Sequence, residues 1–140
     1  EEEEEEGVEG FKPYRCCLGM FWVDSIRYEM KTREVLIGRN TKTSSVDLNL
    51  SGVVNGRSVS RYQAVVKVQD NANFTILNVS SRPISVNGRS LAPSCKVVLP
   101  CFTHIDFGKV RVIFQINTEF QSWLKGMTKD EEEEEEEEEE

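Results

Sequence analysis

The sequence predicts an all-β sandwich of about ten short strands, followed by one short C-terminal helix. Three observations lead to this prediction. Short segments that mix apolar and polar residues recur along the chain, turn-forming residues separate them at close spacing, and no convincing helical pattern occurs before residue 117. A period of two places successive side chains on opposite faces of a strand, so each segment can bury one face against a second sheet.

The first predicted strands are Ile26–Met30, which alternates apolar and polar residues, and Glu34–Arg39, which ends in Gly-Arg. The later strands are Val46–Leu50, Ala64–Gln69, Phe74–Val79, Ile84–Val86, Lys96–Leu99, His104–Phe107 and Val110–Ile116. Ser51–Ser58 is predicted to be a loop because it is rich in Gly, Asn and Ser. Asp70–Asn73 predicts a hairpin turn, and Asn87-Gly88 is a strong two-residue hairpin signal.

The two ends of this region have different patterns. Cys16–Val23 is an apolar cluster without a clear period, and we expect it to pack across the end or side of the sandwich. Thr118 can cap a helix that runs to Gly126 and carries Phe120, Trp123 and Leu124 on one side. We expect that side to dock on the sandwich edge. Trp22 and Trp123 are interpreted as core or docking residues rather than as a peptide-binding patch.

Charge is distributed very unevenly along the 140 residues. Glu1–Glu6 and Glu131–Glu140 supply 16 of the 25 acidic residues, which leaves 9 acidic residues against all 17 Lys and Arg between them. The body therefore carries about +8 and favours anionic partners. We predict disordered acidic tails at residues 1–10 and 127–140, because polyglutamate cannot form a core. Residues 11–126 are predicted to form one domain with a core at 25–117.

The residue types argue against an enzyme. The chain has a single histidine, no GxSxG, no phosphate-cradling glycine loop and no metal-ligand cluster, so we expect no catalytic residue, metal or cofactor. The four cysteines form no CxxC and predict free buried thiols in a reducing compartment. We find no signal-peptide pattern and no segment long enough to span a membrane, so no membrane partner is expected.

Two separate stretches suggest an anion-binding pocket. Arg39 follows Gly38 at the end of a predicted strand, and Ser60-Arg61 precedes another predicted strand. A guanidinium held by a strand can bind an oxyanion through charge-assisted hydrogen bonds. Ser60 can add its hydroxyl and its backbone N–H, and Arg61 can add positive field or brace the loop.

With these pieces in order, the chain resembles the forkhead-associated (FHA) domain over about residues 26–116. The resemblance rests on Gly38-Arg39, Val46-Asp47-Leu48, Ser60-Arg61 and Val86-Asn87-Gly88. It implies an FHA-type β-sandwich of about eleven short strands that binds phosphothreonine through Arg39, Ser60 and Arg61.

One loop departs from the family pattern. FHA domains usually hold the bound peptide with an asparagine after Thr or Ser, whereas this chain has Ser80-Ser81-Arg82-Pro83. We expect Ser81 to replace one hydrogen bond. Arg82 either adds a phosphate contact or selects a different ligand.

More narrowly, the chain is similar to the FHA domain of the microspherule-protein family. The similarity lies in Ile26–Glu34, Ser60–Ala64 and Arg82-Pro83-Ile84, and includes Gln63 where most FHA domains have histidine. It implies a nuclear, and in some members nucleolar, subunit of chromatin-remodelling and histone-acetyltransferase complexes. We expect Gly38, Gln63, Asn87 and Gly88 to support the loops, with Gln63 bracing the Arg39 loop, and His104 to be structural.

Three functions remain open from the sequence. The first is a module that binds phosphothreonine-containing or acidic protein segments. The second is a degenerate FHA domain that binds proteins without phosphate. The third is nucleic-acid binding through a basic face formed by Arg57, Arg61, Arg82 and Arg89, although this face lacks the interleaved aromatic residues of single-strand binders.

Overall fold

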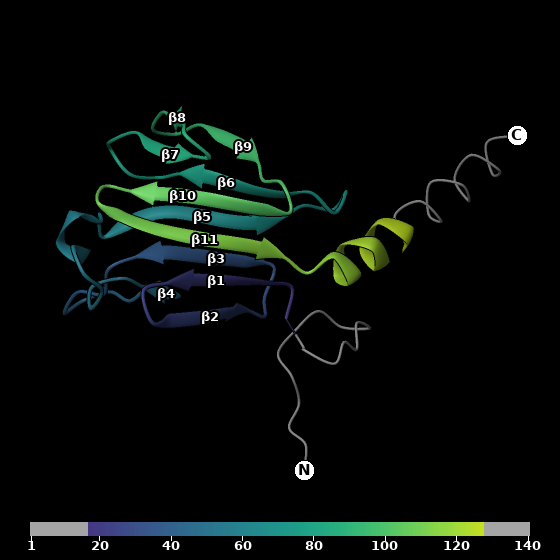
Figure 1. Cartoon of the computed structure of the whole chain (residues 1–140), viewed down its shortest axis with the longest axis horizontal. Helices are drawn as coiled ribbons and strands as arrows, with labels where there is room; N and C mark the ends of the chain where they lie inside the picture. The colour runs from purple at the N-terminus through teal and green to yellow at the C-terminus, as the bar shows by residue number, and fades with distance from the viewer. Residues whose placement is uncertain (1–16, 128–140) are drawn as a thin grey trace, which may run out of the picture.

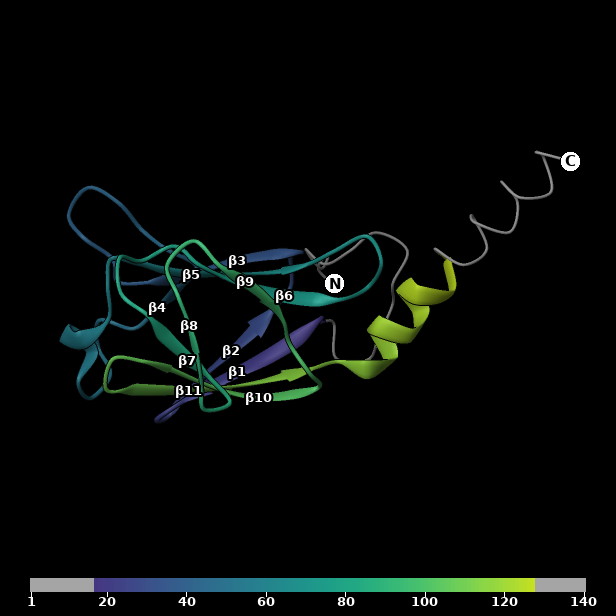
Figure 2. The same cartoon turned by 90° about the horizontal axis from the view of Figure 1, so that it is seen from above.

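The computed structural model describes residues 17–127, which form two packed β-sheets and a C-terminal helix. The six-stranded sheet has the order β2-β1-β11-β10-β7-β8, and the five-stranded sheet has the order β4-β3-β5-β6-β9. The view in Figure 2 separates the two layers. The predicted sandwich of eleven strands is confirmed. The predicted tail at 1–10, and that at 127–140 apart from Met127, which belongs to the helix, lie outside the described residues.

The strand bounds agree with the predicted segments to within about two residues, except that β1 and β8 were not predicted and β4 is shorter than expected. The six-stranded sheet contains β1 (Gly19–Val23), β2 (Ile26–Met30), β7 (Ile84–Val86), β8 (Arg89–Leu91), β10 (Phe102–Phe107) and β11 (Val110–Ile116). The five-stranded sheet contains β3 (Glu34–Gly38), β4 (Leu48–Asn49), β5 (Tyr62–Val68), β6 (Phe74–Asn78) and β9 (Lys96–Val98). A short 3₁₀ helix, η1 (Gly56–Ser58), interrupts the loop between β4 and β5.

The N-terminal apolar cluster was predicted wrongly. Gly19–Val23 does not pack across an end of the sandwich; it forms β1, which pairs antiparallel with both β2 and β11. The sheet therefore begins before the predicted core start at residue 25. Phe21 and Val23 are buried while Trp22 faces outward, which is the alternation of a strand.

The segment Val46–Leu50 was also expected to be a full strand. Only Leu48–Asn49 pairs, and it lies parallel to the end of β3. Asp47 precedes this pair and binds Leu36 twice: its side chain accepts from the Leu36 N–H at 2.7 Å, and its backbone N–H donates to the Leu36 carbonyl at 2.9 Å.

The core joins the two sheets through phenylalanine side chains. Phe114 of β11 contacts Phe21 of β1 and Phe74 of β6, with ring centroids 4.5 and 5.9 Å apart. Phe120 of the C-terminal helix lies 6.3 Å from Phe74 and is completely buried. Aromatic pairs in this distance range add to the hydrophobic gain from burial. The predicted docking of the helix by its aromatic side is therefore confirmed.

The helix spans residues 118–127 as described, but its cap was assigned to the wrong residue. Asn117, not Thr118, accepts hydrogen bonds through its side-chain oxygen from the backbone N–H groups of Glu119 and Phe120, at 3.0 and 3.2 Å. Its amide also donates to the carbonyl of Cys17 at 2.7 Å. One asparagine thus caps the helix and ties it to the start of the sheet.

The structure decides three further expectations. Asn87 and Gly88 both have positive φ, 51° and 82°, as a type I′ hairpin turn requires. Cys17 is buried as predicted, whereas Cys95 and Cys101 are exposed, so the expectation of buried thiols is wrong for these two. Within residues 17–127 no helix is long and apolar enough to cross a membrane.

Candidate functional site

Five residues singled out from the sequence come together in one pocket. Arg39, Ser60, Arg61, Ser81 and Arg82 line a cavity of about 380 Å³, which we call the arginine pocket. Its remaining lining residues are Arg57, Val59, Tyr62, Val79 and Ser80. Their elements, the end of β3, η1, the start of β5 and the end of β6, lie at the end of the sandwich opposite the C-terminal helix (Figure 1).

The position of Arg39 follows from a close contact between two backbones. The N–H of Arg39 donates to the carbonyl of Arg61 at 3.1 Å, and a Cβ added to Gly38 would stand 2.0 Å from that same oxygen. Only glycine fits at residue 38. The predicted supporting role of Gly38 thus has a steric basis: it lets the end of β3 approach the segment before β5.

A hydrogen bond to the backbone orients the guanidinium of Arg39. Its Nε donates to the carbonyl of Val59 at 2.5 Å, and the side chain is half-buried. This contact leaves both terminal nitrogens for other acceptors. A guanidinium held through Nε can present its two terminal N–H₂ groups as a fork to a carboxylate or phosphate.

Ser60 differs from the prediction in one respect. Its backbone N–H, expected to be free for a ligand, donates to the side-chain oxygen of Gln63 at 2.8 Å. Gln63 is buried and lies three residues further along, so a local side-chain bond satisfies this donor. The hydroxyl of Ser60 can still bind a ligand in the arginine pocket. Gln63 is therefore structural, but it holds the Ser60 segment and not, as expected, the Arg39 loop.

The loop between β6 and β7 is held by Asn78, a residue that the sequence did not single out. Asn78 is completely buried, and its amide donates to the carbonyls of Arg82 and Leu91, each at 2.9 Å. Its side-chain oxygen accepts from the N–H and the hydroxyl of Ser80 at 3.0 and 2.8 Å. The backbone at Arg82 is thus fixed, while the side chains of Ser81 and Arg82 are exposed.

Arg57, expected only as part of a possible basic face, also lines the pocket. It lies in η1, whose last residue, Ser58, accepts a hydrogen bond at its hydroxyl from the backbone N–H of Lys109 at 2.9 Å. The bond anchors this loop to the β10–β11 turn. The sequence did offer a signal for Arg57 as a pocket residue: it lies close to Ser60, in the same segment between β4 and β5.

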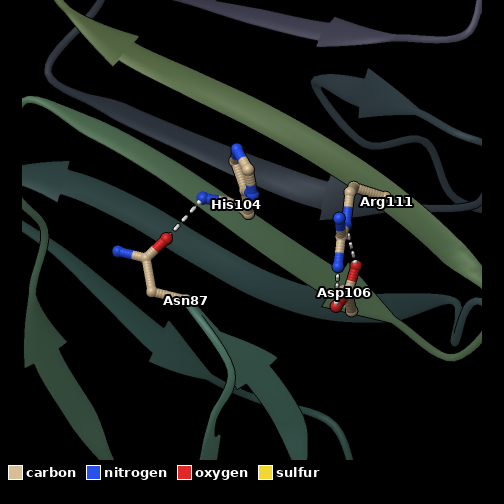
Figure 3. Close-up of polar contacts among 4 residues, drawn as sticks. All are labelled: Asn87, His104, Asp106 and Arg111. Atoms are coloured by element: carbon tan, nitrogen blue, oxygen red, sulfur yellow. Dashed lines mark hydrogen bonds and ion pairs between the residues drawn. The ribbon is translucent and has the colours of Figure 1, made fainter.

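Asn87 and Gly88 do not line the pocket, although we expected them to support its loops. Asn87 instead binds β10: its side-chain oxygen accepts from the N–H of His104 at 2.8 Å (Figure 3). Its own N–H donates to the His104 carbonyl at 2.7 Å. The same figure shows Asp106 bound by two nitrogens of Arg111, at 2.8 and 3.1 Å. These contacts link strands of the six-stranded sheet and are structural.

The charged residues that line the arginine pocket are all positive. Four of its ten lining residues are arginines, and none is acidic. Within residues 17–127, the arginines that form ion pairs are Arg27, Arg33 and Arg111, which all lie elsewhere. The guanidinium group stays protonated in proteins, so the pocket concentrates four uncompensated positive charges. This arrangement suits a multiply charged anion.

A larger depression of about 650 Å³ lies on the β1, β2 and β11 side near the start of the helix. Arg27, Glu29 and Glu119 all line it, so it contains charges of both signs. It contains none of the predicted binding residues. Among the described residues no group of three or more His, Cys, Asp or Glu could hold a metal ion.

Comparison with known proteins agrees with this geometry. The family model of the FHA domain matches residues 35–108, which is more than half of the chain. The N-terminal FHA domain of Rad53p from S. cerevisiae, solved in complex with a phosphothreonine peptide, has a TM-score of 0.63 at 12% identity. That similarity covers 75% of this chain and 98% of the Rad53p chain.

Two further solved structures share the fold. The FHA domain of MEK1, in complex with a HOP1 phosphothreonine peptide, is 22% identical with a TM-score of 0.57, over 72% of this chain and 98% of that chain. EmbR from Mycobacterium tuberculosis, in complex with a low-affinity phosphopeptide, is 20% identical with a TM-score of 0.58, over 80% of this chain and 27% of that chain. The chain therefore belongs to the FHA domain family.

Proposed function

We propose that this domain binds phosphothreonine-containing segments of partner proteins in the arginine pocket, without catalysing a reaction. The observation that carries the proposal is the convergence of Arg39, Ser60, Arg61, Ser81 and Arg82 on one cavity that contains no acidic residue. FHA domains are generally non-catalytic modules that bind phosphothreonine peptides. The structures of the Rad53p and MEK1 domains, both with phosphothreonine peptides, support the same role here.

The chemistry of the pocket matches a phosphate monoester. A phosphothreonine carries about 1.5 to 2 negative charges near neutral pH and three strong acceptor oxygens. The terminal nitrogens of Arg39 would bind two of these oxygens, and the hydroxyl of Ser60 would donate to a third. Arg61, Ser81 and Arg82 surround the same space with further donors.

Titration calorimetry with a phosphothreonine peptide and its unphosphorylated form would test this proposal. Arg39→Gln should weaken binding of the phosphopeptide by roughly tenfold or more, because charge-assisted hydrogen bonds contribute about 1.5–3 kcal/mol. Arg33→Gln is the matched control: it removes the same charge at the opposite end of β3, outside the pocket. Equal affinity of Arg39→Gln and the wild type, or no phosphate dependence, would reject the proposal.

A phosphate-independent binding function is the second candidate. Two observations favour it: Gln63 already binds the Ser60 N–H, and apolar side chains outside the arginine pocket lining are exposed, among them Val98 and Phe102, each 52% exposed. In that case capture of protein partners would survive phosphatase treatment and the Arg39→Gln substitution. Loss of capture after either treatment would favour the phosphopeptide function.

Nucleic-acid binding has the weakest support. Arg57, Arg61 and Arg82 share the pocket, but Arg89, the fourth member of the expected basic face, lies in β8 and does not line it. Binding of an oligonucleotide that persists in Arg39→Gln and falls steeply with salt would support this function instead.

For the cellular setting we propose a nuclear protein of the microspherule type that acts in a chromatin-remodelling or histone-acetyltransferase complex. The support is the similarity of Ile26–Glu34, Ser60–Ala64 and Arg82-Pro83-Ile84 to that family, together with Gln63. Imaging of the tagged full-length protein, with identification of proteins that copurify in an Arg39-dependent manner, would test the assignment. Exclusion from the nucleus would reject it.

A further inference from the structure

The positive charge of the arginine pocket exceeds the negative charge of a single phosphothreonine. The arginine pocket holds four guanidinium groups, whereas one phosphothreonine supplies about 1.5 to 2 negative charges. A single phosphate would leave roughly two positive charges crowded and uncompensated at the site. The excess is local, because no acidic side chain lines the cavity.

A second cavity adjoins the first. This second hollow, of about 260 Å³, is lined by Ser58, Ser60, Gln63, Arg82, Pro83 and Gly108. It shares Ser60 and Arg82 with the arginine pocket, and it has no acidic residue in its lining either. A ligand seated at Ser60 can therefore extend into a neighbouring space without leaving the surface.

Arg82 is the one arginine that lines both cavities. Its backbone is fixed, since the carbonyl accepts from the Asn78 amide at 2.9 Å and the N–H donates to the Ser80 hydroxyl at 3.3 Å. Its hydrogen bonds to described residues use backbone atoms, and its side chain is exposed. The guanidinium thus projects from a fixed backbone at the border between the two cavities, and within residues 17–127 no acceptor binds it.

We infer that the ligand is doubly anionic: a phosphothreonine next to a second negatively charged side chain, which Arg82 binds at the second hollow. This inference rests on the proposed function, because Arg39 and Ser60 must first hold the phosphothreonine. The second charge is a phosphate or a carboxylate, since a guanidinium binds both through the same forked geometry.

Four synthetic peptides with one common sequence would test the inference by titration calorimetry near 0.15 M salt. The first carries phosphothreonine with neutral neighbours, and the second adds a neighbouring phosphoserine. The third replaces the phosphoserine by glutamates, and the fourth has the glutamates with unmodified threonine. A single-stranded oligonucleotide of similar charge serves as the nucleic-acid arm.

We expect the second or third peptide to bind the wild type about tenfold more tightly than the first, the effect of one additional charge-assisted hydrogen bond. The phosphoserine and glutamate arms distinguish the two sources of charge. Arg82→Gln should reduce the ratio between doubly and singly anionic peptides toward one. Arg33→Gln should keep the tenfold ratio, and Arg39→Gln should weaken all phosphothreonine peptides together. A thermal melt checks that Arg82→Gln folds.

The possible failures separate the two proposals. If the first peptide binds in an Arg39-dependent way but the wild type shows no preference for a second charge, the proposed function stands and the inference is overturned. A preference that persists in Arg82→Gln also overturns it. If no phosphothreonine peptide binds, both proposals fail. Equal or tighter binding of the oligonucleotide would assign the arginines to nucleic acid and reject the inference.

Discussion

The side-chain oxygen of Gln63 accepts the backbone N–H of Ser60 at 2.8 Å and so takes a donor that a ligand would otherwise use. Gln63 is 4% exposed, and its own carbonyl accepts the N–H of Val79 at 3.3 Å. One buried glutamine therefore links the segment before β5 to the segment after β6. Both segments line the arginine pocket.

Replacing Gln63 by leucine should loosen this connection. The substitution keeps similar volume but leaves the Ser60 N–H without its partner, which costs about 1–3 kcal/mol for a buried polar group. Urea denaturation should show that loss, and phosphopeptide affinity should fall with it. Gln115→Leu, the same change on the exposed side of β11, should leave both quantities near the wild-type values.

Gly38→Ala should be strongly destabilising. The new Cβ would stand 2.0 Å from the carbonyl oxygen and 2.8 Å from the carbonyl carbon of Arg61, and backbone atoms cannot rotate away as a side chain could. We expect a loss of about 3 kcal/mol or more in the free energy of unfolding, within the range of severe steric substitutions.

Gly52→Ala is the control for this steric argument, since no atom lies within 4 Å of the position of its Cβ. Its free energy of unfolding should stay within about 0.5 kcal/mol of the wild-type value, as for ordinary surface substitutions. Similar losses in both variants would show that the approach of β3 to Arg61 is not the cause.

Asn78→Leu should release the β6–β7 loop. The change removes four hydrogen bonds of a completely buried amide and leaves the Arg82 and Leu91 carbonyls without these partners. We expect a loss of about 2–4 kcal/mol, because unpaired buried groups carry their full desolvation cost. Amide hydrogen exchange at residues 79–82 should accelerate. Asn71→Leu, which removes one exposed bond to Asn73, should change neither measurement appreciably.

Stability at high pH should depend on Tyr28. Burial, and to a smaller extent the carboxylate of Asp47, raises the pKa of the Tyr28 phenol. The folded state thus holds the phenolic proton more tightly than the unfolded state, whose tyrosine pKa is about 10. The resulting stabilisation is complete below the unfolded pKa and is lost as the pH rises through the folded pKa.

Urea unfolding of the wild type and Tyr28→Phe at pH values from about 8 to 11 would check this effect, since that range brackets the unfolded pKa. The stability difference between the two proteins should be constant at the lower pH values and should shift against the wild type above about pH 10. Parallel pH profiles across the whole range would contradict the prediction.

The sequence by itself determined most of the secondary structure. Alternation identified strands such as Ile26–Met30 and Val110–Ile116, because the buried face of a strand repeats every two residues. Asn87-Gly88 identified its turn, since few residues adopt positive φ readily. The residues Arg39, Ser60, Arg61, Ser81 and Arg82 were also identified in advance, because charge and hydroxyl chemistry are readable locally.

Only the tertiary structure decided how these pieces meet. Periodicity tells which face of a strand is buried but not which strand it pairs with, so β1 between β2 and β11 was missed. The bonds from Asn78 to the Leu91 carbonyl and from the Val79 N–H to the Gln63 carbonyl, like the presence of Arg57 in the pocket, depend on segments that converge from different strands. Such contacts are fixed by the packing of two sheets, and no local pattern in the sequence encodes them.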